Sequence, residues 1–147
     1  MEIISGSCRF GLWFVRVWWS GNLVWNVTFS HQPLGGPAPP EVVKFLAGHS
    51  TDLSPLRSAA ATPGSPYSHI YREVLSIPYG STATYGEIAR RAGSSPRMAG
   101  LAMKRNPTPL LIPCHRVVSQ NGIGGFTPDV EIKKMLIDLE QKRKSYN

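Results

Sequence analysis

The chain has 147 residues and a formal net charge of +7; 41% of the residues are hydrophobic and 17% are charged, as in a typical globular protein. No apolar run approaches the roughly 20 residues that cross a bilayer, and the first residues lack the basic and apolar regions of a signal peptide. The membrane and secreted classes are therefore disfavoured, and because two cysteines are too few for a disulfide framework, we expect an intracellular protein.

The N-terminal part is predicted to form β-structure. Residues 13–19 are apolar at nearly every position, which is typical of a strand covered on both faces, and the turn sequence Ser-Gly-Asn follows at 20–22. Residues 23–29 alternate between apolar and polar side chains, which favours a half-buried strand and hence a hairpin in a small antiparallel sheet. Cys8 is expected to be a small buried side chain. The four tryptophans are expected in the core rather than on a binding platform: Trp13, Trp18, Trp19 and Trp25.

Residues 33–66 are rich in Pro, Gly, Ser and Ala and predict a connection with one short helix, at 41–46. We place a domain boundary near residue 65, which gives a β-rich domain at 1–65 and a second domain at 66–147. The first carries four Lys or Arg and three Asp or Glu, whereas the second carries twelve and six. The basic second domain favours a polyanionic partner, nucleic acid first, although charge that serves only solubility explains it equally well.

The second domain is predicted to be helical. A helix over 67–76 is followed by Thr84 and Glu87, which form a capping box for a helix that ends near Arg91. A Gly-Ser-Ser turn then leads into a helix over 96–105, with proline at its first position. A last helix, over 130–143, carries one apolar stripe that should pack on the core: Ile132, Leu136 and Leu139.

Two short helices joined by a tight turn form a helix-turn-helix motif. The second helix carries Arg97, Lys104 and Arg105, and it has small residues that allow a close approach to another surface. Those small residues would equally allow packing against the neighbouring helix. In a basic domain we favour DNA as the contact.

Residues 113–117 read Pro-Cys-His-Arg-Val and follow an apolar run. A thiol is a poor nucleophile until a neighbouring base or cation makes it a thiolate, so Cys114 and His115 are a candidate reactive pair. Adjacency alone is weak support, because neighbouring side chains on a strand point to opposite faces.

The order of several motifs resembles the O6-alkylguanine-DNA alkyltransferase family over residues 67–141. The similar segments, besides 113–117, are Ile-Pro-Tyr-Gly at 77–80, Thr-Tyr at 84–85, Arg-Met-Ala-Gly at 97–100, Asn-Pro at 106–107 and Gly-Ile-Gly-Gly-Phe at 122–126. The resemblance implies an α+β fold, in which a small antiparallel, ribonuclease H-like sheet domain precedes a helical, winged-helix-like domain with a helix-turn-helix.

The resemblance also implies the activity. A protein of this family takes an alkyl group from the O6 of guanine onto its own cysteine, irreversibly and once per molecule, after flipping the nucleotide out of the duplex. The implied partner is double-stranded DNA containing O6-alkylguanine, with no cofactor, no metal and no membrane. We expect a monomer in the cytoplasm, or in the nucleus of a eukaryote.

Site residues follow from the matched positions. Cys114 would be the nucleophile, His115 a base acting through a water, and Glu140 the group that orients the imidazole. Asn106 would hold the turn before the cysteine by bonding its backbone. Tyr85 would donate its phenolic proton to the leaving guanine.

The resemblance also implies a set of DNA contacts. Arg97 would fill the space left by the flipped nucleotide from the minor groove, and Tyr85 would also contact the DNA. Ser94 and Gln120 would hold phosphates. Main-chain groups at Cys114, Val117 and Thr127 would read the base edge. The pocket would be lined by Met103, Pro109, Val117, Phe126 and Thr127.

One segment departs from the family pattern. Where the family has Ser-Gly-Gly after the Gly-Gly-Phe segment, residues 127–129 read Thr-Pro-Asp. Proline fixes φ and removes an N–H group, so the loop should be stiffer and the pocket should prefer methyl over benzyl groups.

Three other functions remain as alternatives. A lesion-binding protein without transfer activity shares this fold but lacks the cysteine. A cysteine hydrolase would use Cys114 and His115 but normally has a helix starting after the cysteine, and no such helix is predicted here. A plain helix-turn-helix regulator would keep Cys114 only as a structural residue.

Overall fold

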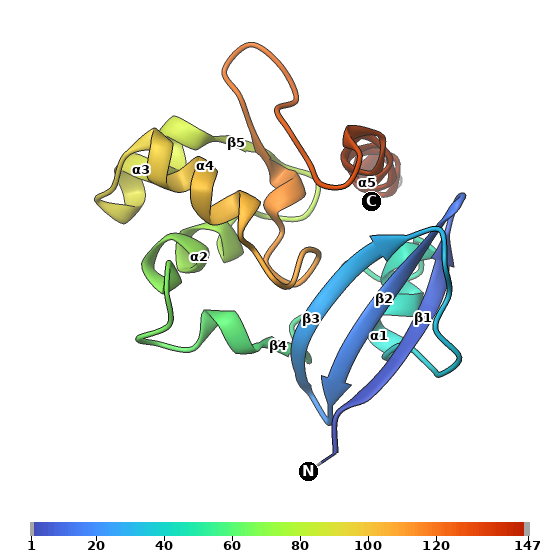
Figure 1. Ribbon diagram of the computed structural model, residues 1–147. Helices are drawn as coiled ribbons and strands as arrows, with labels where there is room; N and C mark the ends of the chain where they lie inside the picture. The colour runs from blue at the N-terminus through green and yellow to red at the C-terminus, as the bar shows by residue number, and fades with distance from the viewer. Residues whose placement is uncertain (1, 146–147) are drawn as a thin grey trace. The chain divides into compact units, whose positions relative to one another are not determined.

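The computed structural model describes residues 2–145, and the chain folds into two compact units (Figure 1). The first unit comprises the residues up to Ala59 together with Pro107–Leu111, and the second comprises Ala60–Asn106 and the residues from Ile112 onward. A sheet near the N-terminus followed by helices makes the fold α+β, which confirms the predicted class. The division near residue 65 stays a prediction of where the chain separates into independently folding parts.

The first unit is built on one four-stranded sheet in the order β1-β2-β3-β4. The strands β1 (Ile4–Phe10), β2 (Trp13–Ser20) and β3 (Leu23–Ser30) are antiparallel neighbours. Gly11 and Gly21 take positive φ angles, of 61° and 60°, in the two tight turns between them. The two-residue strand β4 (Arg57–Ser58) pairs parallel to β3, so the sheet is mixed rather than purely antiparallel.

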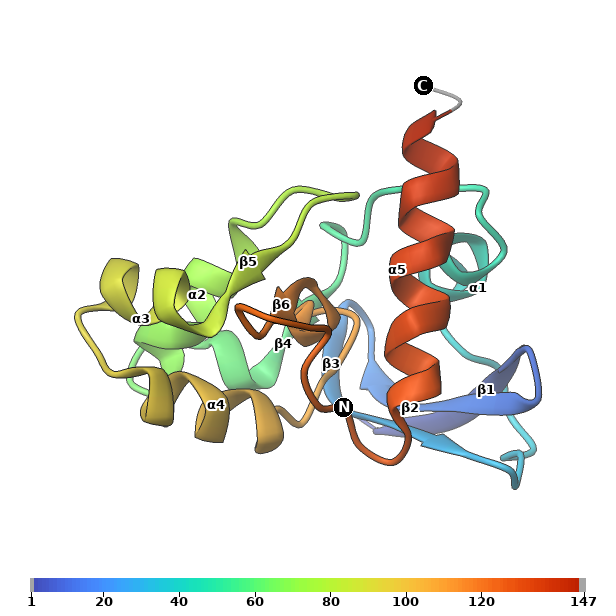
Figure 2. The same cartoon turned by 90° about the horizontal axis from the view of Figure 1, so that it is seen from above.

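The sheet buries one face only. Val15 and Val17 are fully buried, whereas Arg16 and Trp18, which point the other way, are half-buried. The expectation that 13–19 is covered on both faces is therefore wrong. The helix α1 (Pro40–Leu46) lies against the sheet in both views (Figures 1 and 2) and contributes buried apolar side chains to the core of this unit.

The tryptophans are not the core of this unit. Trp13, Trp18 and Trp19 are half-buried, and Trp25 is 44% exposed. The cause at Trp25 is an irregularity in the pairing: Trp18 faces Asn26 but Trp19 faces Val24, so Trp25 has no partner across the strand. This bulge shifts the alternation and buries Val24 instead. The expectation of core tryptophans is wrong, and Cys8 is likewise only partly buried.

The second unit carries the remaining helices (Figure 2). They are the 3₁₀ turn η1 (Ala59–Ala61), which begins at the end of the first unit, α2 (Ser68–Leu75), α3 (Tyr85–Ala92), α4 (Pro96–Lys104), the 3₁₀ turn η2 (Cys114–Arg116) and α5 (Val130–Ser145). The short strands β5 (Ala83–Thr84) and β6 (Val117–Val118) pair in parallel. The predicted helices are thus confirmed, with ends within one or two residues of those expected.

The helix-turn-helix forms because each helix end carries its own signal. The Thr84 hydroxyl accepts from the Glu87 N–H at 3.1 Å to start α3, and Gly93 ends that helix in the left-handed region with φ 66°. Ser95, rather than Ser94, caps α4 by accepting from the Met98 N–H at 3.2 Å. Both helices pack with α2 around buried apolar side chains, and none of the described helices is long and apolar enough to cross a membrane.

Candidate active site

Cys114 begins the short turn η2 and belongs to the apolar core of the second unit. Its side chain is nearly buried, with 7% of the residue exposed, and its N–H donates to the Ile112 carbonyl at 2.7 Å. Because Cys114 and His115 lie on a 3₁₀ turn and not on a strand, the opposite-face objection to the pair does not apply. No α-helix starts at the cysteine.

Burial raises the pKa of the Cys114 thiol above its ordinary value. Asn106 and the positive charge of Lys133 act in the opposite direction and offset part of that increase. At neutral pH the group is therefore a thiol, and a base must remove its proton before the sulfur can attack.

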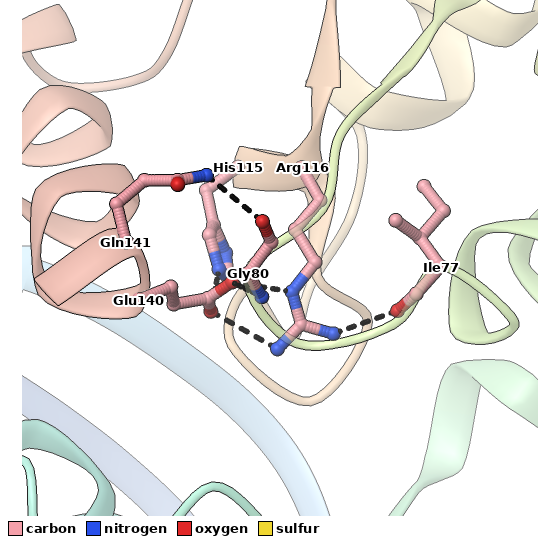
Figure 3. Close-up of polar contacts among 6 residues, drawn as sticks. All are labelled: Ile77, Gly80, His115, Arg116, Glu140 and Gln141. Atoms are coloured by element: carbon pink, nitrogen blue, oxygen red, sulfur yellow. Dashed lines mark hydrogen bonds and ion pairs between the residues drawn. The ribbon is translucent and has the colours of Figure 1, made fainter. Parts of the chain in front are cut away.

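The residue next to it, His115, is fully buried. Its Nε2 lies 2.6 Å from Oε2 of Glu140 on α5 (Figure 3). Burial lowers the pKa of His115 below its ordinary value of 6.5, so the ring is neutral at pH 7. A carboxylate can only accept, so Nε2 carries the hydrogen, and Nδ1, buried without a hydrogen-bond partner, keeps its lone pair.

Glu140 is held by three further donors (Figure 3). The Arg116 guanidinium contacts both carboxylate oxygens, Nε to Oε1 at 2.8 Å and Nη2 to Oε2 at 3.0 Å, and its Nη1 donates to the Ile77 carbonyl at 2.9 Å. The Gly80 N–H donates to Oε1 at 3.1 Å. The adjacent Gln141 donates to the Gly80 carbonyl at 2.8 Å. The carboxylate is therefore fixed in place before any substrate arrives.

These donors keep Glu140 ionised although only 2% of the residue is exposed. Burial acts to raise the pKa of Glu140, but the hydrogen bonds and charges of His115 and Arg116 outweigh it and lower the pKa to about 2. The bidentate guanidinium compensates the buried negative charge. Glu140 consequently stays a hydrogen-bond acceptor for His115 throughout the physiological pH range.

Sequence reasoning missed Lys133, a fully buried lysine on the same helix. Its Nζ donates to the Val117 carbonyl at 2.6 Å and to the Gly125 carbonyl at 3.2 Å, and it lies 5.8 Å from the centre of the Tyr85 ring. Burial lowers the pKa of Lys133 to about 8, and the Cys114 charge acts to raise it. The signal in the sequence was spacing: Lys133 precedes Glu140 by two helical turns and therefore shares its face.

Tyr85 and Gly124 approach each other closely beside Lys133. A Cβ atom on Gly124 would come within 3.1 Å of the Tyr85 hydroxyl oxygen and 3.2 Å of the Lys133 Nζ, and the φ angle of Gly124 is +81°. The left-handed backbone conformation favours glycine at this position, and a Cβ atom would require the Tyr85 and Lys133 side-chain ends to shift by a few tenths of an ångström. Burial and the nearby charge of Cys114 raise the pKa of Tyr85, so its hydroxyl keeps its proton at neutral pH.

Asn106 follows α4 and reaches the segment before the cysteine. Its side-chain amide donates to the Ile112 carbonyl at 2.8 Å. The turn between α4 and η2 is thereby tied at a carbonyl that also accepts from the Cys114 N–H. This contact sets the position from which η2 starts.

The remaining predicted residues differ in their surroundings. Arg97 is exposed near the start of α4, Ser94 is half-buried in the turn before it, and Gln120 and Thr127 are exposed. Met103 and Val117 are buried, and Phe126 packs against the same core as Cys114. Pro109 belongs to the first unit. Among residues 2–145, no group of three or more His, Cys, Asp or Glu side chains is arranged to hold a metal ion.

Comparison with known proteins bears directly on this site. A sequence model of a protein family, described as "6-O-methylguanine DNA methyltransferase, DNA binding domain", matches residues 65–142 of this chain. A methylated-DNA–protein-cysteine methyltransferase of Metallosphaera sedula is 49% identical over 96 residues, 65% of this chain and 61% of that protein. The chain thus spans about three fifths of the length of this relative.

Two solved structures are similar over nearly the whole chain. The Mycobacterium tuberculosis O6-methylguanine methyltransferase has a TM-score of 0.77 at 25% identity, covering 97% of this chain and 94% of that one. A Mycobacterium tuberculosis protein named OGT, solved in complex with DNA, has a TM-score of 0.75 at 26% identity, covering 93% and 92%. The expected family resemblance is confirmed, and the chain belongs to the 6-O-methylguanine DNA methyltransferase family.

Proposed function

We propose that this protein repairs DNA by moving the alkyl group, methyl above all, from the O6 of guanine onto the Sγ of Cys114. The observation that carries the proposal is the buried set of Cys114, His115 and Glu140, in which a neutral imidazole adjoins a thiol and is anchored 2.6 Å from a fixed carboxylate. The likeness to a relative solved with DNA supports DNA as the partner. Double-stranded DNA containing O6-alkylguanine is the substrate class.

The first step is removal of the thiol proton. Nδ1 of His115 is the free basic atom, because Nε2–H is held by Glu140. A water molecule between the thiol and Nδ1 carries the proton, so the two side chains need no direct bond. The imidazolium that forms is stabilised by the Glu140 carboxylate.

The second step is one displacement at the alkyl carbon. The thiolate sulfur forms a bond to that carbon while the bond from carbon to O6 breaks, and the electron pair goes to the guanine. The Tyr85 hydroxyl donates a proton to the guanine ring, and the proton held on His115 restores the phenol through solvent. The products are guanine and a thioether; nothing in the site reverses a thioether, so each molecule acts once.

The target base must leave the duplex to reach a buried thiol, at a cost of a few kcal/mol. In this proposal Arg97 enters the vacated space, and Ser94 and Gln120 contact phosphates; the exposure of Arg97 near the start of α4 supports its role. Met103, Val117, Phe126 and Thr127 form the pocket in this proposal. We also propose that the protein acts as a monomer without a cofactor, in the cytoplasm or nucleus.

Mass spectrometry after incubation with duplex DNA containing O6-methylguanine tests the proposal. We expect a gain of one methyl group on the peptide containing Cys114, at no more than one per chain. The chain offers a matched control in its second cysteine: Cys8→Ala must keep the transfer and Cys114→Ala must lose it. If wild-type protein binds the lesion but gains no mass, the function is lesion recognition without transfer. Repeated turnover of an ester would instead indicate a hydrolase.

A further inference from the structure

The sheet of the first unit has a second face that the fold does not bury. We define the outer sheet face as the side chains of β1–β3 that point away from the buried Val15 and Val17. They are the odd-numbered residues from Ser5 to Arg9 and the even-numbered residues from Phe14 to Trp18 and from Asn26 to Ser30, as the strand pairing places them. Each of them is exposed or half-buried.

The outer sheet face contains basic and uncharged residues but no acidic ones. It holds two arginines, two aromatic rings and otherwise only serine, threonine and asparagine. Every polar member can donate a hydrogen bond, and no acidic residue occurs anywhere between Glu2 and Glu41. An exposed protein surface normally mixes charges of both signs. A face with donors and cations but no carboxylate complements a polyanion.

The arginines and rings alternate in space. The Arg9 guanidinium lies 5.6 Å from the centre of the Phe14 ring, and that of Arg16 lies 5.5 Å from the Trp18 ring. The Arg16 Nη1 donates to the Ser30 hydroxyl at 3.3 Å, and the Arg9 Nε donates to the Gly11 carbonyl at 3.0 Å. Both guanidinium groups are thus held over flat apolar surfaces, and each has more N–H donors than these bonds use.

From this arrangement we propose that the outer sheet face binds a short single-stranded stretch of nucleic acid. Bases stack at Phe14 and Trp18, and phosphates bind Arg9 and Arg16. Phe14 and Trp18 are four residues apart on β2, about 13 Å at the rise of an antiparallel strand. That distance suits two or three extended nucleotides. Aromatic rings combined with arginines are what sequence-independent single-strand binding requires.

A photocrosslinking experiment locates the contact directly. The full chain is irradiated with an oligodeoxythymidine carrying 5-iodouracil, and the crosslinked peptides are identified by mass spectrometry. We expect crosslinks at Phe14 or Trp18. Crosslinks confined to α3, α4 and the segment around Cys114 would overturn the proposal. The oligonucleotide contains no guanine, so failure here leaves the transfer activity of Cys114 untouched.

Affinity for the same oligonucleotide, measured by fluorescence anisotropy, gives the second test. Trp18→Ala and Arg16→Gln should each bind about tenfold more weakly, within the range found when one stacking side chain is removed. Val43→Ala is the control, because Val43 is an exposed apolar residue of α1, outside the outer sheet face, and this variant should bind as wild type. All three variants should transfer methyl groups at the wild-type rate.

Two further measurements distinguish base stacking from misfolding and from self-association. Trp18→Phe keeps an aromatic ring and should bind the oligonucleotide within about twofold of wild type. With that result, the weaker binding of Trp18→Ala reflects the loss of the ring and not a defect in folding. Sedimentation velocity tests a second copy of the chain as the occupant. Self-association that Trp18→Ala abolishes, together with unchanged oligonucleotide binding, would overturn the proposal.

Discussion

The Nε2 atom of His115 lies 2.6 Å from Oε2 of Glu140, and both residues are buried. This contact decides which nitrogen of the imidazole is free to act as the base, and it would stabilise the ring once it is charged. The same carboxylate receives two bonds from Arg116 and one from the Gly80 N–H, so its orientation does not depend on substrate.

Replacing Glu140 with glutamine should slow methyl transfer by about a hundredfold, the range found when acid–base assistance is impaired. The amide no longer stabilises the imidazolium, and it leaves the buried Arg116 without a counter-charge. Single-turnover transfer from methylated duplex DNA measures the effect. Asp138→Asn, which removes an exposed carboxylate from the same helix, is the control and should react at the wild-type rate.

The free energy of unfolding should decrease in two stages as the pH is lowered. The unfolded chain binds a proton at His115 below pH 6.5, which the buried ring resists, so stability is complete above 6.5 and declines below it. The Glu140 carboxyl, with its pKa lowered from 4.5 to about 2, adds a second loss as pH falls between those values. Urea unfolding at a series of pH values measures both stages.

The first of these stages is assigned by a variant. His115→Asn should lose the decline that begins at pH 6.5, whereas the exposed His69→Asn should retain it. Parallel stability curves for wild type and His115→Asn would contradict the assignment.

Lys133 should lower the pKa of the Cys114 thiol through its charge. In Lys133→Met the thiol pKa should be higher than in wild type, because the favourable effect of the cation on the thiolate is lost. Methyl transfer should slow by about tenfold, the equivalent of about one pKa unit. The pH dependence of Cys114 alkylation by iodoacetamide reports the shift. The neighbouring Lys134 is exposed, so Lys134→Met should titrate like wild type.

The sequence predicted helix ends correctly at positions where one residue type restricts the backbone conformation. Thr84, Gly93 and the proline at the start of α4 defined the helix ends, because capping and φ restriction act within a few residues. The Cys-His pair and Glu140 were recognisable as a candidate site from their motif. The helical spacing alone would have made Glu140 a solvated charge, and only tertiary structure shows the Arg116 and Gly80 contacts that bury it.

The interior of the first unit was less predictable. The apolar run at 13–19 suggested burial on both faces, yet Trp18 lies beneath Arg16 on the open face. The bulge at Trp25 could not be predicted from the sequence either, because a bulge depends on the pairing with the neighbouring strand and not on local propensity. Lys133 escaped notice because a buried cation is stabilised by carbonyls that are distant in sequence from it, at Val117 and Gly125.

The loop at 127–129 should make the protein selective for small alkyl groups. Pro128 fixes one φ angle two residues after Phe126, which packs on the core that contains Cys114, so the loop has less freedom to move aside for a bulky group. We expect faster transfer from O6-methylguanine than from O6-benzylguanine in the same duplex, measured as single-turnover rate constants. Pro128→Gly should raise the benzyl rate several-fold more than the methyl rate. Pro63→Gly changes another exposed loop proline and should leave the ratio as it is. Comparable wild-type rates on the two lesions would sink the idea.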